Sequence, residues 1–120
     1  MNIALWIVQI ILALAFLAAG VMKATQPLEK LAQNMGWVND FSPAFVRFIG
    51  VAEVLGAIGL VAPLALDIAP VLTPVAATAL AVTMVGAAVV HARRKESPMI
   101  MPNLVLAAAC AFVAVGRFAA

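Results

Sequence analysis

The polar side chains within or at the ends of long apolar stretches of this sequence include Gln9, Lys23, Glu53, His91 and Asn103. If these stretches cross a membrane, each polar group in them is costly to bury and becomes a candidate functional site. An amine, a carboxylate and an imidazole can exchange protons, and side-chain amides can hydrogen-bond a polar ligand. We therefore predict catalytic roles for Lys23, Glu53 and His91, and ligand binding by all five residues.

Glu53 is the strongest of these candidates, because carboxylates deep inside a membrane are rare. Unpaired, it would be neutral, since desolvation disfavours the charged form, whereas Lys23 or His91 beside it could keep it ionised. The functional interpretation is a carboxylate that handles protons or binds a ligand. The structural alternative is a salt bridge or a protonated hydrogen bond between helices.

The other candidates also have structural alternatives. Lys23 could be a lysine that extends to the membrane interface and orients its helix. His91 could cap the end of its helix beside a basic loop instead of shuttling a proton near neutral pH. Asn103 could make a polar contact near the start of its helix and have no further role.

Four apolar segments must position these residues. A hydrocarbon core about 30 Å thick needs about 20 residues of helix to span it. The segments of that length are residues 2–22, 43–62, 70–91 and 101–118. The second segment begins with proline after a helix-capping residue, Ser42, and we expect Pro63 to end it.

The composition is typical of a membrane protein. Of its 120 residues, 67% are hydrophobic and 10% are charged, whereas globular chains are about 45–50% apolar and about 25% charged. A soluble domain of this size could not bury so much apolar surface. We therefore predict an all-α membrane protein: one domain over residues 1–120, a four-transmembrane-helix bundle with a short amphipathic segment at 27–33 in the first loop.

Residue counts disfavour several kinds of site. The single cysteine, Cys110, permits neither an intrachain disulfide nor a CxxC redox couple. One histidine with scattered carboxylates lacks the spacing of metal or haem ligands, so we predict no metal site and no covalently bound cofactor. The slight excess of basic residues lies in loops, which indicates membrane orientation and not nucleic-acid binding.

Helical periodicity puts the strongest polar residues of each segment on one line, at 100° per residue. The lines are Gln9, Ala13, Phe16, Gly20 and Lys23; Val46, Gly50, Glu53, Ala57 and Leu60; Thr73, Leu80, Met84, Ala87 and His91; and Asn103, Ala107, Cys110, Ala114 and Arg117. We predict that these lines face the interior of the bundle. Side chains lean toward the N-terminus of their helix, so Lys23, Glu53, His91 and Asn103 should converge in one half of the bundle.

Basic residues predict how the bundle is oriented in the membrane. Lys23, Lys30, Arg47 and Arg93-Arg94-Lys95 fall on the side of the first and third loops, and Arg117 falls on the other side. By the positive-inside rule, both long loops lie in the cytoplasm and both termini lie outside it.

Two helix motifs resemble those of a known family. Phe16–Lys23, with the sequence FLAAGVMK, resembles the F-x-x-A-G-x-x-K end of the first helix of DoxX-like membrane proteins, and Gly50–Leu60 resembles their G-x-x-E-x-x-G-x-x-G-L second helix. His91 and Asn103 also fall where such proteins carry polar residues. The resemblance implies a four-helix fold in the bacterial cytoplasmic membrane. The family takes its name from a subunit of an archaeal thiosulfate:quinone oxidoreductase, and other members are linked to membrane-associated redox complexes.

We predict a small membrane subunit of a redox-linked, quinone-associated complex that binds a small ligand or a proton at the Lys23, Glu53, His91 and Asn103 cluster. If the chain is enzymatic, the resemblance implies that it acts as a subunit of a membrane oxidoreductase. The expected partners are membrane lipid, a soluble or peripheral redox protein and further copies of the chain, with quinone as the ligand. A proton-coupled transporter subunit, a non-catalytic scaffold and a self-contained enzyme acting on a lipid-soluble substrate remain alternatives.

Overall fold

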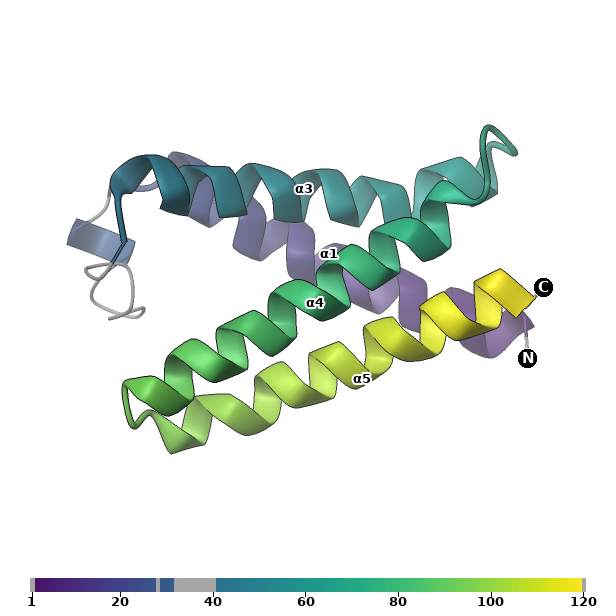
Figure 1. Cartoon of the computed structure of the whole chain (residues 1–120). Helices are drawn as coiled ribbons and strands as arrows, with labels where there is room; N and C mark the ends of the chain where they lie inside the picture. The colour runs from purple at the N-terminus through teal and green to yellow at the C-terminus, as the bar shows by residue number, and fades with distance from the viewer. Residues whose placement is uncertain (1, 28, 32–40, 120) are drawn as a thin grey trace.

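A computed structural model of the protein describes residues 2–27, 29–31 and 41–119. Within these residues the chain forms four long helices, shown in Figure 1: α1 (Asn2–Thr25), α3 (Pro43–Ala65), α4 (Leu72–Arg93) and α5 (Ser97–Ala119). Each helix contains a stretch that is long and apolar enough to cross a membrane. The prediction of an all-α membrane protein with four transmembrane helices is therefore confirmed.

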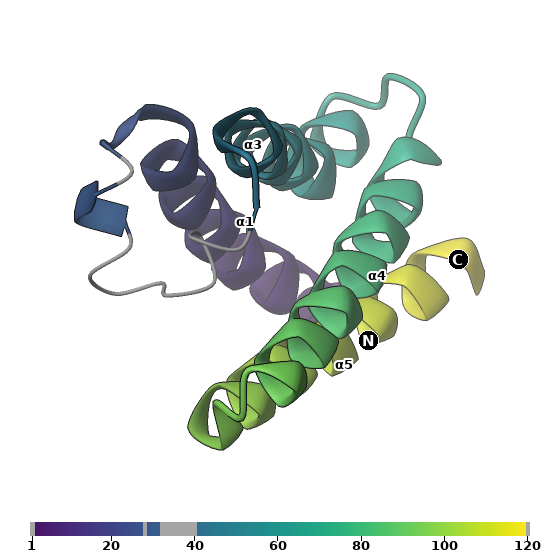
Figure 2. The ribbon, with the colours of Figure 1, turned by 60° about the vertical axis from the view of Figure 1, so that its left-hand side comes forward.

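The helices form two antiparallel pairs. α1 packs along α3 and α4 packs along α5, whereas contact between the pairs is less extensive (Figure 1). The pairs approach each other at the end of the bundle that holds both termini, and they diverge toward the other end (Figure 2). We call these the closed end and the open end. The open end holds the last turns of α1 and α4 and the first turns of α3 and α5.

Two glycines let α1 and α3 cross at backbone contact. A methyl group added at Gly20 would lie 2.6 Å from the carbonyl oxygen of Gly50, and one added at Gly50 would lie 2.6 Å from the backbone nitrogen of Ala24. These distances are too short for a side chain, so the helices approach this closely only because both residues are glycine. The crossing brings the end of α1, with Lys23, against the middle of α3, with Glu53.

The buried residues follow the lines expected from helical periodicity. On α3 the buried residues are Val46, Gly50, Glu53, Ala57 and Leu60, which is the predicted line in full. On the other three helices most residues of the predicted lines are buried. The partly exposed members are Ala13, Lys23, Ala87, Asn103 and Arg117. An apolar core that includes Leu12, Phe16, Leu60, Leu80 and Cys110 fills the middle of the bundle.

α3 does not end at Pro63, and that prediction is wrong: the helix continues to Ala65. Proline lacks the N–H that would bond the carbonyl group of Gly59, but membrane helices tolerate such a missing hydrogen bond. The N–H of Leu66 donates to the carbonyl oxygen of Ala62 at 2.9 Å, which closes the last turn.

The last helix also runs through a proline. α5 begins at Ser97, before the predicted start at 101, and Pro102 lies inside it. α4 begins at Leu72, slightly later than the predicted 70. The third loop is confined to residues 94–96, so α4 and α5 form a tight hairpin.

The described part of the first loop packs against the open end. The described part of the predicted amphipathic segment contains one helical turn at residues 29–31. Leu31 in this turn is buried against Val46 of α3, with Phe41 packed beside them. Residues 28 and 32–33 of the segment lie outside the described residues.

Candidate functional site

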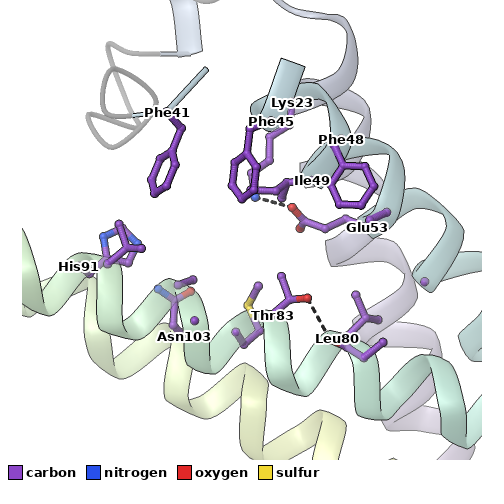
Figure 3. Close-up of a pocket in the computed structure, with 17 residues that line it drawn as sticks. Lys23, Phe41, Phe45, Phe48, Ile49, Glu53, Leu80, Thr83, His91 and Asn103 are labelled. Atoms are coloured by element: carbon purple, nitrogen blue, oxygen red, sulfur yellow. Dashed lines mark hydrogen bonds and ion pairs between the residues drawn. The ribbon is translucent and has the colours of Figure 1, made fainter. Parts of the chain in front are cut away.

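A cavity of about 480 Å³ lies between the two helix pairs at the open end. Figure 3 shows its two walls: Lys23 and Glu53 lie on the wall formed by α1 and α3, and His91 and Asn103 lie on the wall formed by α4 and α5. The rest of the lining is mostly apolar and includes Phe41, Phe45, Phe48, Ile49, Leu80 and Met84. The structure thus brings these four polar residues to one cavity.

An ion pair joins α1 to α3 on the first wall. Lys23 Nζ lies 2.5 Å from Glu53 Oε1, with only 12% of the lysine side chain and 2% of the glutamate side chain exposed. Of the two partners considered for Glu53 from the sequence, the structure shows Lys23. Each charge compensates the other, which is the condition under which a buried carboxylate and a buried amine are tolerated.

Arg47 of α3 forms a hydrogen bond with the backbone of Lys23. Its Nη1 donates to the backbone carbonyl oxygen of Lys23 at 2.7 Å. That carbonyl group belongs to the last turn of α1, where carbonyl oxygens lack partners within the helix and where the helix dipole favours a cation. Sequence reasoning assigned Arg47 only to membrane orientation, because nothing in its spacing indicates a contact with α1.

On the other wall, His91 pairs with a residue of the third loop. Its ring nitrogen Nδ1 lies 2.9 Å from Glu96 Oε1, and Arg94 Nε donates to the same oxygen at 3.2 Å. The hydrogen bond with His91 lowers the pKa of Glu96 below its usual range; desolvation opposes this shift, and the charge of Arg94 supports it. Sequence reasoning missed Glu96, because spacing alone does not show that the chain turns back to His91 after the helix ends.

Asn103 contributes a hydrogen-bond donor to the second wall. Its amide nitrogen Nδ2 is buried, and within the described part of the chain it has no hydrogen-bond partner. Buried polar groups are nearly always paired in proteins, so an unpaired one calls for an explanation. Because Asn103 lines the cavity, an oxygen atom of a ligand is a partner that would satisfy it.

Gln9 lies at the closed end, away from the other four candidates. Its side-chain nitrogen donates to the carbonyl oxygen of Leu60 at 2.6 Å, and its side-chain oxygen accepts a hydrogen bond from Arg117 Nε at 2.7 Å. Arg117 also donates to Asn2 Oδ1 at 2.8 Å, and its guanidinium group lies 5.4 Å from the centre of the Trp6 ring. The structure therefore places Gln9 in a separate polar network and not at the cavity.

The groups around the cavity offer donors and proton-exchanging groups beside an apolar space. Lys23 and Asn103 can donate to ligand oxygen atoms from opposite walls, and Glu53 and His91 can exchange a proton with them. Among the described residues there is no group of three or more His, Cys, Asp or Glu side chains that could hold a metal ion. The chemistry of these groups suits a small organic ligand with polar oxygen atoms and an apolar body.

The sequence matches a family model over most of its length. The family is described as DoxX-like, and the match covers residues 7–113. The chain belongs to the DoxX-like family. Comparisons with curated proteins and with solved structures found no match. The matched range of this DoxX-like protein includes the four polar residues of the cavity and both helix motifs, which supply Lys23 and Glu53 to its first wall.

Proposed function

We propose that this DoxX-like protein binds a lipid-soluble ligand of the quinone class at its open end, as a small membrane subunit of a redox-linked complex. The observation that carries the proposal is an apolar cavity with polar groups on both walls, Lys23 with Glu53 on one and His91 with Asn103 on the other. A quinone has two carbonyl oxygens on opposite edges of a planar ring, and an apolar tail. The cavity has the same division of polar and apolar groups.

The size and the lining of the cavity suit such a ring. Small-molecule sites commonly enclose about 300–1,000 Å³ and are mostly apolar, with a few polar groups that fix orientation. This cavity encloses about 480 Å³. Phe41 and Phe45 line it as a stacked pair with ring centres 5.1 Å apart, and aromatic faces pack well against a planar ring. Because the cavity lies between diverging helix pairs, we expect the apolar tail to leave it toward the lipid.

Reduction of such a ligand requires protons as well as electrons. Lys23 can donate a proton to a ligand oxygen during reduction, and Glu53 and His91 can take one up during the reverse oxidation. The sequence contains no motif that we associate with an electron-carrying cofactor. Electrons would therefore pass to or from a soluble or peripheral redox partner bound to this subunit.

We further propose that the protein lies in the bacterial cytoplasmic membrane, with the open end in the cytoplasm and both termini outside. Basic residues of the first and third loops and of the adjoining helix ends lie at the open end, and Arg117 lies at the closed end, which supports this orientation. The apolar core between the two ends, which includes Phe16, Leu60 and Leu80, favours a binding site over a continuous transport pathway.

Ligand binding to the full chain in lipid nanodiscs tests the proposal. A benzoquinone with a decyl tail is titrated, and binding is followed by the rise in Tm that a ligand of the folded state produces. Asn103→Leu is expected to weaken binding about tenfold, because it removes one hydrogen bond to the ligand. Thr73→Val is the matched control, since Thr73 also has a buried polar atom without a partner in the described chain but lies at the start of α4, near the closed end.

Saturable binding that weakens in Asn103→Leu and persists in Thr73→Val supports the proposal. Decylcyclohexane, which has the tail and a ring but no oxygen atoms, is expected to leave Tm unchanged. Absence of saturable quinone binding overturns the proposal. An equal loss in both variants also overturns it, because a general change in packing would then explain the result.

A further inference from the structure

Glu96, in the third loop, is in contact with the imidazole ring of His91. Its Oε1 lies 2.9 Å from His91 Nδ1 and accepts a hydrogen bond from Arg94 Nε at 3.2 Å. His91 is 7% exposed and lines the cavity. Glu96 lies between the membrane spans, and 30% of its side chain is exposed. The pair therefore connects the cavity wall with the surface of the loop.

The backbone of the loop explains why Glu96 folds back beside His91. Lys95 has a left-handed conformation, with φ of 59°. Its N–H donates to the carbonyl oxygen of Ala92 at 3.1 Å, and the N–H of Glu96 donates to the carbonyl oxygen of His91 at 2.8 Å. This is the Schellman pattern that ends many helices, with lysine at the position where glycine is usual. The turn returns Glu96 to the backbone of His91, which keeps its side chain close to the imidazole ring.

The charge of the carboxylate fixes which ring nitrogen of His91 carries a proton. The hydrogen bond with His91 lowers the pKa of Glu96, desolvation opposes the shift, and Arg94 supports it, so Glu96 is ionised at neutral pH. An ionised carboxylate only accepts hydrogen bonds, so Nδ1 of His91 must be the donor. In the neutral ring, Nε2 is then the unprotonated nitrogen, which can accept a proton.

We infer that Glu96 is a positioning residue for His91: it keeps Nε2 as an acceptor and so selects a ligand head that carries a hydroxyl group. The inference rests on the proposed function and narrows it to the reduced, hydroquinone form of the ligand. The hydroxyl group donates to Nε2, and its oxygen atom can accept a hydrogen bond from Asn103 on the same wall. Transfer of the hydroxyl proton to Nε2 moves one proton and no electrons, and it gives an imidazolium ion beside the Glu96 carboxylate.

Other charged groups lie around the same ring. Lys23 and Glu53 line the opposite wall of the cavity and are paired with each other. Arg94 shares Glu96 with His91 and is a second nearby cation. Glu96 is in direct contact with Nδ1 of His91, so its loss removes the acceptor that keeps Nδ1 as the donor and Nε2 free to accept from a ligand hydroxyl group.

The state of the ring can be observed directly, because the chain contains one histidine. Nitrogen-15 labelling of histidine in the full chain, in lipid nanodiscs, reports His91 alone. We expect chemical shifts of a neutral ring with a protonated Nδ1 and an unprotonated Nε2. Glu96→Ala, which removes the acceptor, is expected to lose this single state and to show a neutral ring protonated at Nε2. A ring protonated at Nε2 in the wild-type protein overturns the inference without any variant.

Binding of the two redox forms gives the second readout. A benzoquinol with a decyl tail and the matching benzoquinone are titrated into the wild-type protein, Glu96→Ala and Lys95→Gly. The last is the control, because glycine suits the left-handed backbone and leaves Glu96 in place. Glu96→Ala is expected to weaken quinol binding about tenfold, the value of one hydrogen bond, and to leave quinone binding unchanged.

The outcomes separate this inference from the proposed function. A tenfold loss confined to the quinol in Glu96→Ala, and absent in Lys95→Gly, supports the inference. An equal loss for both ligands, or no loss, overturns it while the proposed function stands. Failure of the wild-type protein to bind either ligand overturns the proposed function, and the nitrogen-15 spectrum still decides the state of His91.

Discussion

The two ends of the bundle use polar side chains in different ways. At the closed end, Arg117 of α5 donates to Gln9 and Asn2 of α1, so these hydrogen bonds link one helix pair to the other. At the open end, Lys23 pairs with Glu53 inside the α1 and α3 pair. On the opposite wall, His91 is held by the loop that joins α4 to α5.

The helix pairs also pack more closely at the closed end than at the open end. At the closed end, a methyl group added at Gly116 would lie 2.6 Å from Leu5 Cδ2, so α5 and α1 are in direct contact. At the open end, Gly86 lines the cavity, and a methyl group added there would meet no atom within 4 Å. Polar residues of this membrane bundle therefore link the helix pairs where they touch, and they line a cavity where the pairs diverge.

Lys23→Met is expected to have the largest effect on the open end. It removes the amine, keeps an unbranched side chain, and leaves Glu53, whose side chain is 2% exposed, without this cation. Removal of one partner of a buried ion pair costs about 3–5 kcal/mol of unfolding free energy. Unfolding by SDS in lipid bicelles measures the loss, and binding of the decyl benzoquinone is expected to disappear.

The double variant Lys23→Met/Glu53→Met separates stability from binding. Apolar replacement of both partners leaves no uncompensated charge, so most of the lost stability is expected to return. Ligand binding is expected to stay absent, because the polar groups of that wall are gone. Recovery of binding together with stability would show that the ion pair only links α1 to α3, in the way that Arg117 links the two pairs.

Gln9→Leu perturbs the closed end in a comparable manner. It removes the acceptor 2.7 Å from Arg117 Nε and the donor 2.6 Å from the Leu60 carbonyl oxygen. Hydrogen bonds to charged groups contribute about 1.5–3 kcal/mol, and we expect a loss of that size in the unfolding free energy. Ligand affinity in the same preparation is expected to be unchanged, because Gln9 is not at the cavity. A tenfold or greater fall in affinity would contradict the functional separation of the two ends.

Two glycine variants compare a tight crossing with the cavity wall. Gly50→Ala places a methyl group against the α1 backbone and is expected to cost about 1–3 kcal/mol, because overpacking forces the helices apart. Gly86→Ala is expected to raise the unfolding free energy by up to about 1 kcal/mol, since alanine favours the helix and the position has space. SDS unfolding of both variants checks the difference. Equal losses would mean that the open end is as tightly packed as the crossing of α1 and α3.

Much of the fold follows from the periodicity of single helices. An α-helix repeats every 3.6 residues, so polar residues spaced at that period identify an interior face before any partner helix is known. The line through Gly50, Glu53 and Ala57 was predicted in this way, and all three residues are buried. Pro63 was misjudged because the rule that proline ends a helix is weaker for helices that cross a membrane.

Partners in other helices depend on information that one helix does not contain. Gln9 and Lys23 lie on the same predicted line of α1, yet Gln9 hydrogen-bonds Arg117, 108 positions later in the chain, and Lys23 pairs with α3. The depth at which helices cross decides which partner each residue meets. Glu96 escaped prediction because its contact depends on a left-handed turn at Lys95, a position that glycine or asparagine would have signalled.

Acidification is expected to give the smallest effect, through Glu96 at the open end. The hydrogen bond with His91 holds the pKa of Glu96 below its usual range, so the folded protein binds that proton less readily than the unfolded chain does. The contribution of Glu96 to stability is therefore present above the usual glutamate pKa of about 4.3 and is lost as the pH falls through the lowered value. The difference in Tm between the wild-type protein and Glu96→Gln should be present at pH values above about 4.3 and be lost as the pH falls below that value.

Gln9→Leu provides the matched comparison for this pH series, because its contacts at the closed end involve no carboxylate. The Tm difference between Gln9→Leu and the wild-type protein is expected to show no step over the same pH range. A difference for Glu96→Gln that stayed unchanged well below about pH 4.3 would contradict the lowered pKa of Glu96. The pH series would then no longer separate the carboxylate of Glu96 at the open end from the neutral amide of Gln9 at the closed end.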